Sequence, residues 1–493
     1  MIRSSALLMV GVFTLFCSLG LTSCVNGEEA GEAVRPPNVI FILADDLGYG
    51  DVSCYGQKHF ATPHIDALAK NGLKFTQGYS GSTVCAPSRC CLMTGLHSGH
   101  AVVRGNAEVQ PEGQAPMPAD TKTVAHLLQS AGYQTGIFGK WGLGGPETVS
   151  EPMKMGFNRF YGYNCQREAH GYYPTHLWSD NTKVLLPENE DEQMGKYAPH
   201  LIQEEALKFI RANRDRPFFC YYAAIQPHAD MVAPEDYMER HRGKYGTESP
   251  HKKGHYRAQP EPRAAFAAMV NVLDDYVGGI VAELKAQGIA DNTLIIFTSD
   301  NGPHKEGGHD FRYFDCSGEL KGEKRDLYEG GVRVPMIASW PSKIAAGTET
   351  DQITAFWDFL PTMAALSGQN LSQPTDGVSI LPTLYGKAEQ QQQHDYLYWE
   401  FPAKKGRIAI RKGNWKGVRY NIGIDPNSPL ELYDLQSDIG ETTNVASRNP
   451  EITSQLGKLL KSARTVPANP KFDLPKPKKK MKKKQQNKEK ALN

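Results

Sequence analysis

Four apolar runs, each followed at once by a polar cluster, constrain the fold more than any other feature of the sequence. Each run is short and nearly continuous, which is typical of strands that are covered on both faces of a sheet. The runs are 38–43 (NVIFIL), 133–138 (YQTGIF), 218–225 (FFCYYAAI) and 293–298 (TLIIFT). Patterns typical of helices lie between them, at 65–71, 123–130, 201–213 and 264–287. The alternation predicts an α/β fold in which helices sandwich a large β-sheet.

The polar clusters indicate where such a fold would hold a functional site. The clusters are Asp45-Asp46, Gly139-Lys140, Gln226-Pro227-His228 and Ser299-Asp300-Asn301-Gly302. In an open α/β sheet, ligands bind beyond the carboxyl ends of the strands. Each cluster follows the carboxyl end of a predicted strand, so these residues are the first candidates for the site.

The distribution of charge excludes one class of partner. Residues 24–470 hold 44 basic and 52 acidic side chains, a net charge of −8, although the whole chain has a net charge of only +1. An acidic body is not what a general nucleic-acid binder shows, so we expect no nucleic acid partner. The apolar fraction of 40% also excludes disorder throughout the chain.

The first 23 residues are typical of an export signal. Arg3 precedes an uncharged apolar run, 6–21, that is short for a membrane span. The run ends at Leu21-Thr22-Ser23-Cys24, which resembles the bacterial lipoprotein box, in which the Cys is lipidated and becomes the mature N-terminus. A plain cleaved signal with an incidental Cys24 is the alternative. Both interpretations predict export to the periplasm or the cell surface, and the first adds membrane attachment by lipid. We expect residues 24–36 to be a linker.

The pattern of expected secondary structure changes in the C-terminal part of the chain. Short strand patterns at 396–401, 407–411, 415–420 and 431–434 are followed by a helical pattern near 452–462. They predict a small antiparallel α+β subdomain over residues 391–466. Residues 467–493 are rich in Pro and Lys, and 471–493 alone hold ten Lys against two acidic residues. Such a segment cannot fold alone, and we expect a disordered, solvated tail. The alternative is electrostatic attachment to a polyanion, such as anionic lipid headgroups or a sulfated polymer.

The segment 82–95 (STVCAPSRCCLMTG) carries the chemistry. Pro87 and Ser88 are expected just inside the start of a helix, because proline is favoured at the first helical positions. A helix N-terminus suits an anion, and Cys85 would lie there with Arg89 one turn further on. A bare cysteine in that place would be a nucleophile of low pKa. A structural thiol is the alternative for an isolated cysteine.

This segment resembles the signature of the formylglycine-dependent type I sulfatases, C-x-P-S-R followed by an apolar pair and T-G. The resemblance extends over the whole body, and it implies an alkaline-phosphatase-like catalytic domain over residues 37–390. It also implies that a maturation enzyme converts Cys85 to formylglycine, an aldehyde. Seven cysteines remain after residue 24, an odd number, and the conversion would give one of them a distinct fate.

Other parts of the chain match the family residue by residue. Asp45 and Asp46 in ILADDLGYGD and Asp300 and Asn301 in SDNGP match two pairs of ligands for Ca²⁺, a cation that oxygen atoms bind well. In the family, the oxygen of formylglycine at position 85 completes the ion's coordination. Either pair alone would be taken for a turn or a helix cap; two pairs flanking a nucleophile favour a metal site.

The resemblance also assigns the charged residues that would act on the substrate. Lys140 lies in the second family signature, Lys324 in LKGEKRDLYEGGVRVP, and His228 follows Pro227 at a strand end. In the family, residues at these positions contact the sulfate or protonate the leaving oxygen. Arg89 would help to hold the sulfate. One hydroxyl of hydrated formylglycine would attack sulfur, and loss of a proton from the other would release sulfate.

One departure from the family pattern affects the base. The family usually has G-K-W-H-L-G, whereas this chain has Gly142 in place of the His. In the family that His touches the formylglycine hydroxyl. His304 and His309 are candidates for a substitute base, or alternatively for substrate contacts.

The resemblance implies a hydrolase of sulfuric esters that releases sulfate from a sulfated carbohydrate or an aryl sulfate. A phosphonate or phosphate ester hydrolase of the same superfamily is one alternative. A catalytically silent protein that binds sulfated glycans, with Cys85 unmodified, is the other.

Overall fold

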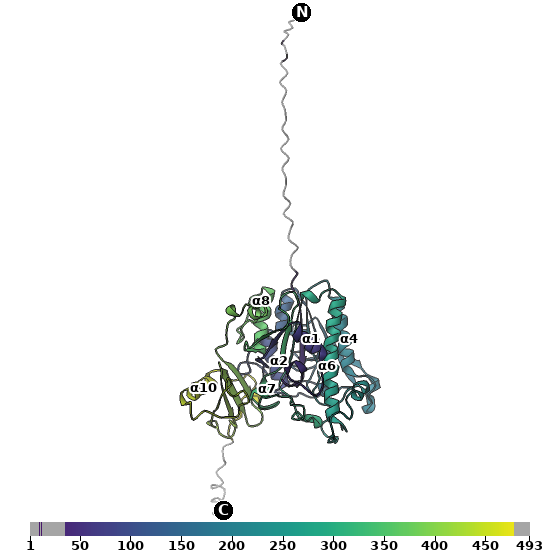
Figure 1. Cartoon of the computed structure of the whole chain (residues 1–493). Helices are drawn as coiled ribbons and strands as arrows, with labels where there is room; N and C mark the ends of the chain where they lie inside the picture. The colour runs from purple at the N-terminus through teal and green to yellow at the C-terminus, as the bar shows by residue number, and fades with distance from the viewer. Residues whose placement is uncertain (1–8, 10, 12–34, 478–493) are drawn as a thin grey trace, which may run out of the picture. The chain divides into compact units, whose positions relative to one another are not determined.

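The computed structural model describes residues 9, 11 and 35–477 (Figure 1). The chain divides into two units at Arg35, and the account below concerns the second, from Pro36. Apart from residues 9 and 11, the predicted signal peptide lies outside the described residues, as do Cys24, nearly all of the predicted linker and residues 478–493 of the predicted tail.

A mixed ten-stranded sheet forms the centre of the body. Its strands, in spatial order, are β11 (Thr348–Thr350), β2 (Leu73–Phe75), β10 (Met336–Ser339), β9 (Thr293–Ser299), β1 (Asn38–Ala44), β8 (Phe218–Ala223), β4 (Gln134–Lys140), β5 (Arg159–Tyr163), β6 (His176–Ser179) and β7 (Thr182–Leu185). The five strands from β9 to β5 are parallel, and antiparallel pairs flank them on both sides, while the edge strand β11 pairs in parallel with β2. A separate pair joins β3 (Gly78–Tyr79) and β12 (Thr354–Ala355).

Helices cover both faces of this sheet, as the apolar runs predict. Val39, Phe41 and Leu43 of β1 enter one apolar core, and the alternate residues Ile40 and Ile42 enter the other. The first core is closed by α2 (Cys85–Thr94), α3 (Val124–Ser130) and α8 (Phe359–Ser367). The second core is closed by α1 (Pro63–Lys70), α4 (Ala198–Ala212) and α6 (Pro262–Ala286) (Figure 1).

Helix α6 is the one helix of the described residues that is long and apolar enough to cross a membrane. Most of it is buried inside the body, where α1, α4 and the short α5 (Glu235–Glu239) pack against it. Its apolar character is therefore that of a core helix. Two other short helices, α7 (Glu329–Val332) and α9 (Leu381–Leu384), lie in connections.

A second, four-stranded sheet forms the C-terminal part of the body. It is antiparallel, with the order β13 (Leu397–Phe401), β14 (Arg407–Lys412), β15 (Trp415–Tyr420) and β16 (Glu431–Asp434). Helix α10 (Pro450–Ser462) packs on β14 and β15, and its Leu456 and Leu460 join a small core of their own. The α/β fold with a small antiparallel C-terminal sheet is thus confirmed. The boundary predicted at 390/391 falls in the connection before β13.

The prediction that disorder begins at residue 467 is wrong. Residues 470–472 form a short 3₁₀ helix, and Phe472 is only 3% exposed, because its ring belongs to the first apolar core. Asp473 forms an ion pair with Arg464 at 3.0 Å. Composition averages over the whole Lys-rich segment, so it does not reveal that one aromatic side chain is buried.

Candidate active site

The four polar clusters meet at one edge of the sheet. The carboxyl ends of β1, β8, β4 and β9 are adjacent, since Leu43 pairs with Ala223, Ala223 with Gly139, and Ala44 with Ser299. Parallel strands place the residues that follow them on the same side. The sheet therefore brings the four clusters together at the place where the sequence predicts a site.

Cys85 is the first residue of α2 and lies at the centre of this edge. The extended backbone of Val84 precedes it, so the helix starts two residues before Pro87. Its side chain is almost fully buried, with Sγ 3.4 Å from Oδ1 of Asp45. The prediction of a low pKa is wrong for this thiol. Burial and the negative charge of Asp45 raise the pKa of Cys85, and the nearby lysines do not offset them.

Three carboxylates and one amide surround the nucleophile. Asp46 has a left-handed backbone, with φ of 65°, which turns the chain sharply after Asp45. The backbone N–H of Asp46 donates to Oδ1 of Asp300 at 3.1 Å, and Nδ2 of Asn301 donates to Oδ1 of Asp46 at 2.7 Å. Within the described residues, Oδ1 of Asn301 is buried and accepts no hydrogen bond. These side chains therefore present oxygen atoms to one small buried space.

Three buried cations balance the carboxylates. Nζ of Lys140 lies 2.5 Å from Asp45, and Nζ of Lys324 lies 2.6 Å from Asp46. The guanidinium of Arg89 donates twice to Oδ2 of Asp300, at 2.8 and 3.1 Å, and once to the carbonyl of Lys140 at 2.8 Å. Arg89 is thus fixed in orientation one turn after Cys85.

The electrostatics of the carboxylates differ. Burial acts to raise the pKa of Asp45, but the charge of Lys140, with smaller effects from other cations, outweighs it and holds that pKa well below its usual value. Burial and the charge of Asp45 raise the pKa of Asp300 to about 7, although Arg89 acts against them. The buried site therefore has room for more positive charge than its own side chains supply.

His228 lies over Asp46, with Nε2 3.4 Å from Oδ2. Its Nδ1 is 2.5 Å from the carbonyl of Ala229, so this nitrogen carries the hydrogen and donates it. Burial, and next the charge of Lys324, lower the pKa of His228 well below its usual value. The ring is therefore neutral, with Nε2 free to accept a proton.

His170 was not predicted from the sequence. Its ring stacks on that of His228, with 4.4 Å between centroids, and it comes from a short 3₁₀ turn at 168–170. No strand end or family motif marks this position. Only the three-dimensional structure shows that His170 adjoins His228.

Gly142 stands where the family pattern has a His, and Gln166 fills the space beside it. A Cβ added at Gly142 would lie 2.0 Å from Nε2 of Gln166, which donates to the carbonyl of Gly142 at 3.2 Å. Oε1 of Gln166 is buried and has no partner in the described part of the chain. Gln166 follows β5, the parallel neighbour of β4, so the aromatic run RFYGY could have pointed to it.

The two candidate substitute bases occupy different places. His304 is buried beside the site, where its Nε2 is 3.0 Å from the carbonyl of Pro227 and Nδ1 is 3.4 Å from Glu306. Burial acts to lower the pKa of His304, but Glu306 and Asp46 outweigh it and raise that pKa. The ring of His309 stacks on Phe266 at 3.8 Å, within the apolar core. The structure therefore brings His304, and not His309, to the other site residues.

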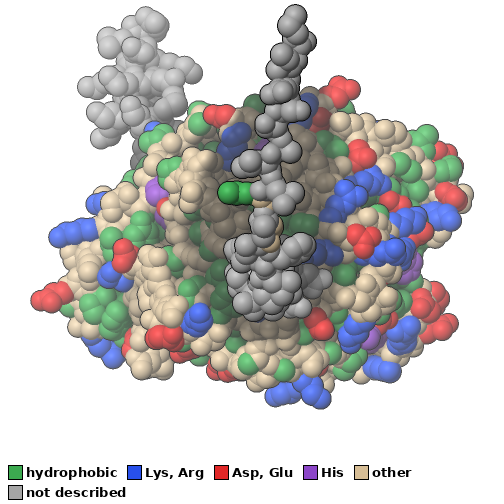
Figure 2. Space-filling model, turned by 90° about the horizontal axis from the view of Figure 1, so that it is seen from above, with side chains coloured by type: hydrophobic (Ala, Val, Ile, Leu, Met, Phe, Trp, Pro, Cys, Tyr) green, Lys and Arg blue, Asp and Glu red, His purple; other side chains and the backbone are tan. Residues whose placement is uncertain are grey.

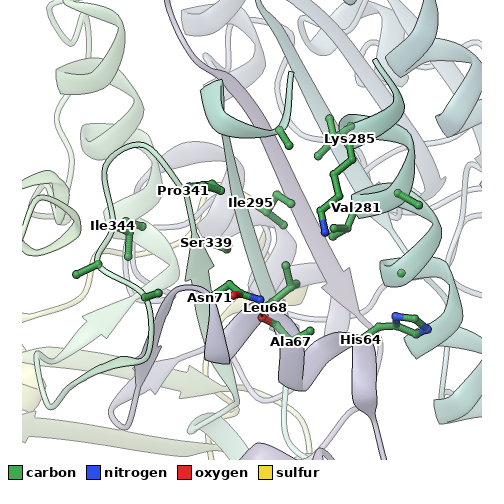
Figure 3. Close-up of a pocket in the computed structure, with 16 residues that line it drawn as sticks. His64, Ala67, Leu68, Asn71, Val281, Lys285, Ile295, Ser339, Pro341 and Ile344 are labelled. Atoms are coloured by element: carbon green, nitrogen blue, oxygen red, sulfur yellow. Dashed lines mark hydrogen bonds between the residues drawn. The ribbon is translucent and has the colours of Figure 1, made fainter. Parts of the chain in front are cut away.

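A large cavity of the body lies at the other end of the sheet (Figure 3). It measures about 710 Å³ and is lined mainly by apolar residues of α1 and α6. Ile295 near the start of β9 and Ser339 at the end of the antiparallel β10 form its floor. It holds none of the predicted site residues.

Comparison with known proteins identifies the family. The sulfatase family model matches residues 37–369, more than half of the chain. This chain belongs to the sulfatase family. A second model, of the C-terminal region of N-sulphoglucosamine sulphohydrolase, matches residues 318–466, which include the antiparallel sheet and α10. The protein is a sulfatase enzyme with the catalytic and C-terminal parts of that family.

Relatives of this sulfatase match nearly its whole length. Human arylsulfatase A is 34% identical, over 87% of this chain and 88% of the relative. The N-acetylgalactosamine-6-O-sulfatase of Bacteroides thetaiotaomicron is 29% identical, over 90% of this chain and 97% of the relative. Among solved structures, Ps i-CgsB in complex with k-i-k-neocarrahexaose is 28% identical and aligns with a TM-score of 0.73, over 88% and 94% of the two chains.

The wider fold is shared with another hydrolase. The phosphonate monoester hydrolase of Agrobacterium radiobacter aligns with a TM-score of 0.59 at 21% identity, over 87% of this chain and 95% of the other. At this identity the likeness concerns the fold alone.

Proposed function

We propose that this sulfatase releases inorganic sulfate from a sulfated carbohydrate, with formylglycine at position 85 and one Ca²⁺ in the site. The observation that carries the proposal is the buried Cys85 at the start of α2, enclosed by Arg89, Lys140 and Lys324. Fixed cations around one buried nucleophile suit a substrate whose reacting group is an anion. Hydrolysis of sulfate esters is the activity of the family.

Two relatives support a carbohydrate as the substrate. One is named N-acetylgalactosamine-6-O-sulfatase, and the similar crystal structure of Ps i-CgsB was determined with a neocarrahexaose. Both match most of this chain. An aryl sulfate presents the same reacting group and therefore serves as a test substrate.

The oxygen-bearing side chains fit a Ca²⁺ ion. Asp45, Asp46, Asp300 and Asn301 offer carboxylate and amide oxygens, which this hard cation prefers. A cation among them would give a partner to the buried Oδ1 of Asn301, which lacks one in the described structure. It would also offset the cost of burying the negative charge of Asp300. We propose that these four residues and the side chain at position 85 hold the ion. When bound, Ca²⁺ supplies positive charge that offsets charge on the sulfate oxygens and favours ionisation of a neighbouring hydroxyl.

We propose that a maturation enzyme converts Cys85 to formylglycine, because the encoded thiol is itself poorly ionised. Burial and Asp45 raise the pKa of the thiol, so it is a weak nucleophile as it stands. The hydrated aldehyde carries two hydroxyls, one to attack sulfur and one to lose a proton so that sulfate leaves. A thiol offers no second hydroxyl.

The cationic side chains bind and orient the sulfate group. Arg89 is held by Asp300 and by the carbonyl of Lys140, so its position costs no reorganisation when substrate binds. Lys140 and Lys324 each contact one of the paired carboxylates after β1. From there their ammonium groups neutralise the sulfate oxygens.

Lys324 and His228 are the residues that we assign to proton transfer to the departing oxygen. Burial acts to lower the pKa of Lys324, but Asp46 and other anions outweigh it and raise that pKa, so this ammonium is protonated when substrate binds. His228 is neutral and exposes Nε2 as an acceptor. We therefore assign proton donation to Lys324 with His228 beside it, and His304 is our candidate for the base that the family places at Gly142.

Export and lipid attachment remain part of the proposal. They are supported by the apolar run 6–21 and by Cys24 in a lipoprotein-like box, which lie outside the described residues apart from two positions in the run. Replacing Cys24 by serine should move the protein from the membrane fraction to the soluble fraction of its host. Equal partitioning of both proteins would contradict lipidation.

Mass spectrometry of the peptide that contains Cys85 tests the central proposal, with protein from the native host. We expect loss of sulfur and gain of an aldehyde oxygen, together with sulfate release from sulfated sugars. Phosphate and phosphonate monoesters, assayed in parallel, test the alternative ester. An intact thiol in fully active protein would contradict the proposal, and so would faster turnover of a phosphonate.

A further inference from the structure

Two connections of the chain converge over His228 without a role in the proposed chemistry. One is the turn 168–170, which carries His170, and the other is the loop 251–259 between α5 and α6, which carries Tyr256. The centroid of the Tyr256 ring lies 5.8 Å from that of His170 and 6.3 Å from that of His228. Because His228 is assigned to the proton of the departing oxygen, these two rings lie beside the leaving group.

Asp230 holds the two connections together. Its backbone N–H donates to the carbonyl of His170 at 2.9 Å. Its Oδ1 accepts a hydrogen bond, also of 2.9 Å, from the backbone N–H of Arg257, the residue after Tyr256. Two backbone hydrogen bonds, of 2.7 and 2.9 Å, close the ends of the loop. The two side chains are therefore placed around His228 by folded backbone before a substrate binds.

The polar atoms of both side chains are available to a ligand. Both residues are half-buried, and within the described residues neither the ring nitrogens of His170 nor the phenol oxygen of Tyr256 forms a hydrogen bond. Burial lowers the pKa of His170, and the charge of Lys140 adds to this, so the ring is neutral. Burial raises the pKa of Tyr256, although Lys324 opposes it, so the phenol keeps its proton. Each group can thus donate one hydrogen bond and accept another.

The character of the side chains changes with distance from the nucleophile. The buried residues around Cys85 are charged, and three of them are the cations that we place on the sulfate. Beyond the buried His228, the half-buried His170 and Tyr256 are polar but neutral. A sulfated sugar has the same order, because its anionic reacting group is followed by the ester oxygen and then by hydroxyls. Neutral groups that both donate and accept fit hydroxyls better than a second anion.

The end of the body away from the site has a different surface. Figure 2 views the end from which β1 starts, and there basic and acidic side chains are interspersed over the visible part. The site follows the carboxyl end of β1, so His170 and Tyr256 belong to the opposite end. There the exposed His255 packs edge-on against Tyr256, with 4.7 Å between centroids, and extends the group of neutral rings toward solvent.

We propose that His170 and Tyr256 determine specificity by forming hydrogen bonds with hydroxyl groups of the sugar that carries the sulfate. This inference rests on the proposed function and extends it to the residues that recognise the leaving group. A simple aryl sulfate has no such hydroxyls, so it would gain only the contacts of its sulfate group and ring. A site built to bond a hydroxyl discriminates against a ligand that lacks it.

Support of the His228 ring is the competing role for these residues. Stacking of His170, at 4.4 Å between centroids, would hold His228 in place whatever the substrate. Support alone therefore predicts equal losses with a sulfated sugar and with an aryl sulfate when either residue is changed. Recognition of hydroxyls predicts a larger loss with the sugar.

Two variants of the full chain distinguish these roles. Tyr256→Phe removes only the phenol oxygen, and His170→Phe removes both nitrogens but keeps a ring that can stack on His228. Tyr385→Phe is the matched control, because Tyr385 is 37% exposed and packs on Trp340, outside the site. kcat/KM is measured with 4-nitrophenyl sulfate and with the best substrate of a panel of sulfated monosaccharides that includes N-acetylgalactosamine 6-sulfate. Melting temperatures establish that each variant is folded.

We expect each of the two variants to lower the ratio of kcat/KM for the sugar to kcat/KM for the aryl sulfate about fivefold, the effect of losing one hydrogen bond between neutral groups. Tyr385→Phe should leave the ratio unchanged. A ratio that falls in only one variant would assign recognition to that residue and overturn it for the other. An unchanged ratio in both variants would overturn the inference, and equal losses with both substrates would favour support of His228.

Failure of the proposed function is a separate outcome. If the unaltered protein hydrolyses no sulfate ester, the proposed function fails. Calorimetric binding of the same sulfated monosaccharides, with Ca²⁺ present, then decides the inference. Weaker binding by both variants would support it, whereas equal binding by all proteins, or no binding by the unaltered protein, would overturn it.

Discussion

Replacing Lys140 by methionine should reveal two separate roles of one buried ion pair. Nζ of Lys140 lies 2.5 Å from Oδ2 of Asp45, and both side chains are fully buried. Methionine keeps most of the apolar length of lysine but not its charge, so Asp45 would remain buried and poorly balanced. Removing one partner of a buried pair costs about 3–5 kcal/mol. Arg89 stays 3.7 Å from Asp45, so we expect the lower end, about 3 kcal/mol.

The same substitution removes a cation that we place on the sulfate. Loss of one preorganised donor to a charged transition state lowers kcat by about 10²–10³. We expect a loss of about a hundredfold on an aryl sulfate. Urea unfolding followed by tryptophan fluorescence measures the first effect, with and without Ca²⁺, and initial rates measure the second. Added Ca²⁺ should reduce the loss of stability, since it offers Asp45 another positive charge.

A double variant distinguishes the two roles. Asp45→Asn combined with Lys140→Met removes both charges, so the free energy of unfolding should recover while activity stays low. Lys343→Met, on the exposed surface, is the matched control for the change of residue type. Normal stability of Lys140→Met without Ca²⁺ would refute the ion-pair argument, and normal activity would refute contact with the sulfate.

Three further outcomes follow from other contacts. Ca²⁺ at a hundred times its Kd should stabilise the protein by about 2.7 kcal/mol, and Asn301→Ala should lose most of that in calorimetry; an equal shift would exclude Asn301 as a ligand. Gly142→Ala should lower the free energy of unfolding by about 1–3 kcal/mol, because φ is +71° and the Cβ meets Gln166; adding Gln166→Ala should recover only the part due to the collision. Burial raises the pKa of Glu441 to about 7, and Glu329 adds to this although Lys416 opposes it, so stability should decline as pH rises from about 4 through 7; urea titrations of Glu441→Gln should show a flatter profile.

The central strands were predictable because burial on both faces gives a strand a recognisable sequence pattern. Strands β1, β8, β4 and β9 are buried at nearly every position, and the predicted runs match them to within a few residues. The outer strands carry no such pattern. β7 is exposed at three of four positions, and β11 has only three residues, so neither contrasts with the loops around it.

The sequence predicted which residues would meet where they follow central strands, and missed residues whose proximity only folding reveals. The paired clusters could be predicted together because their strands end at one edge of the sheet, whereas Cys85 was predicted from the motif at the start of its helix. Gln166 and His170 lie in irregular connections, and only three-dimensional packing shows that they adjoin Gly142 and His228. His309 appeared equivalent to His304, but its ring packs on Phe266 in the apolar core, whereas the ring of His304 packs against His228.

The balance of charge in the site shows why a cation matters for binding the product. Three buried carboxylates, Asp45, Asp46 and Asp300, face three buried cations, so the side chains alone sum to zero with His228 neutral. A neutral buried site has little attraction for sulfate, whereas a bound Ca²⁺ gives it a charge of +2. We therefore expect inorganic sulfate to raise the melting temperature when Ca²⁺ is present and to have little effect in a chelator. Chloride at equal ionic strength is the control, and equal protection by sulfate without Ca²⁺ would show that the three side-chain cations suffice.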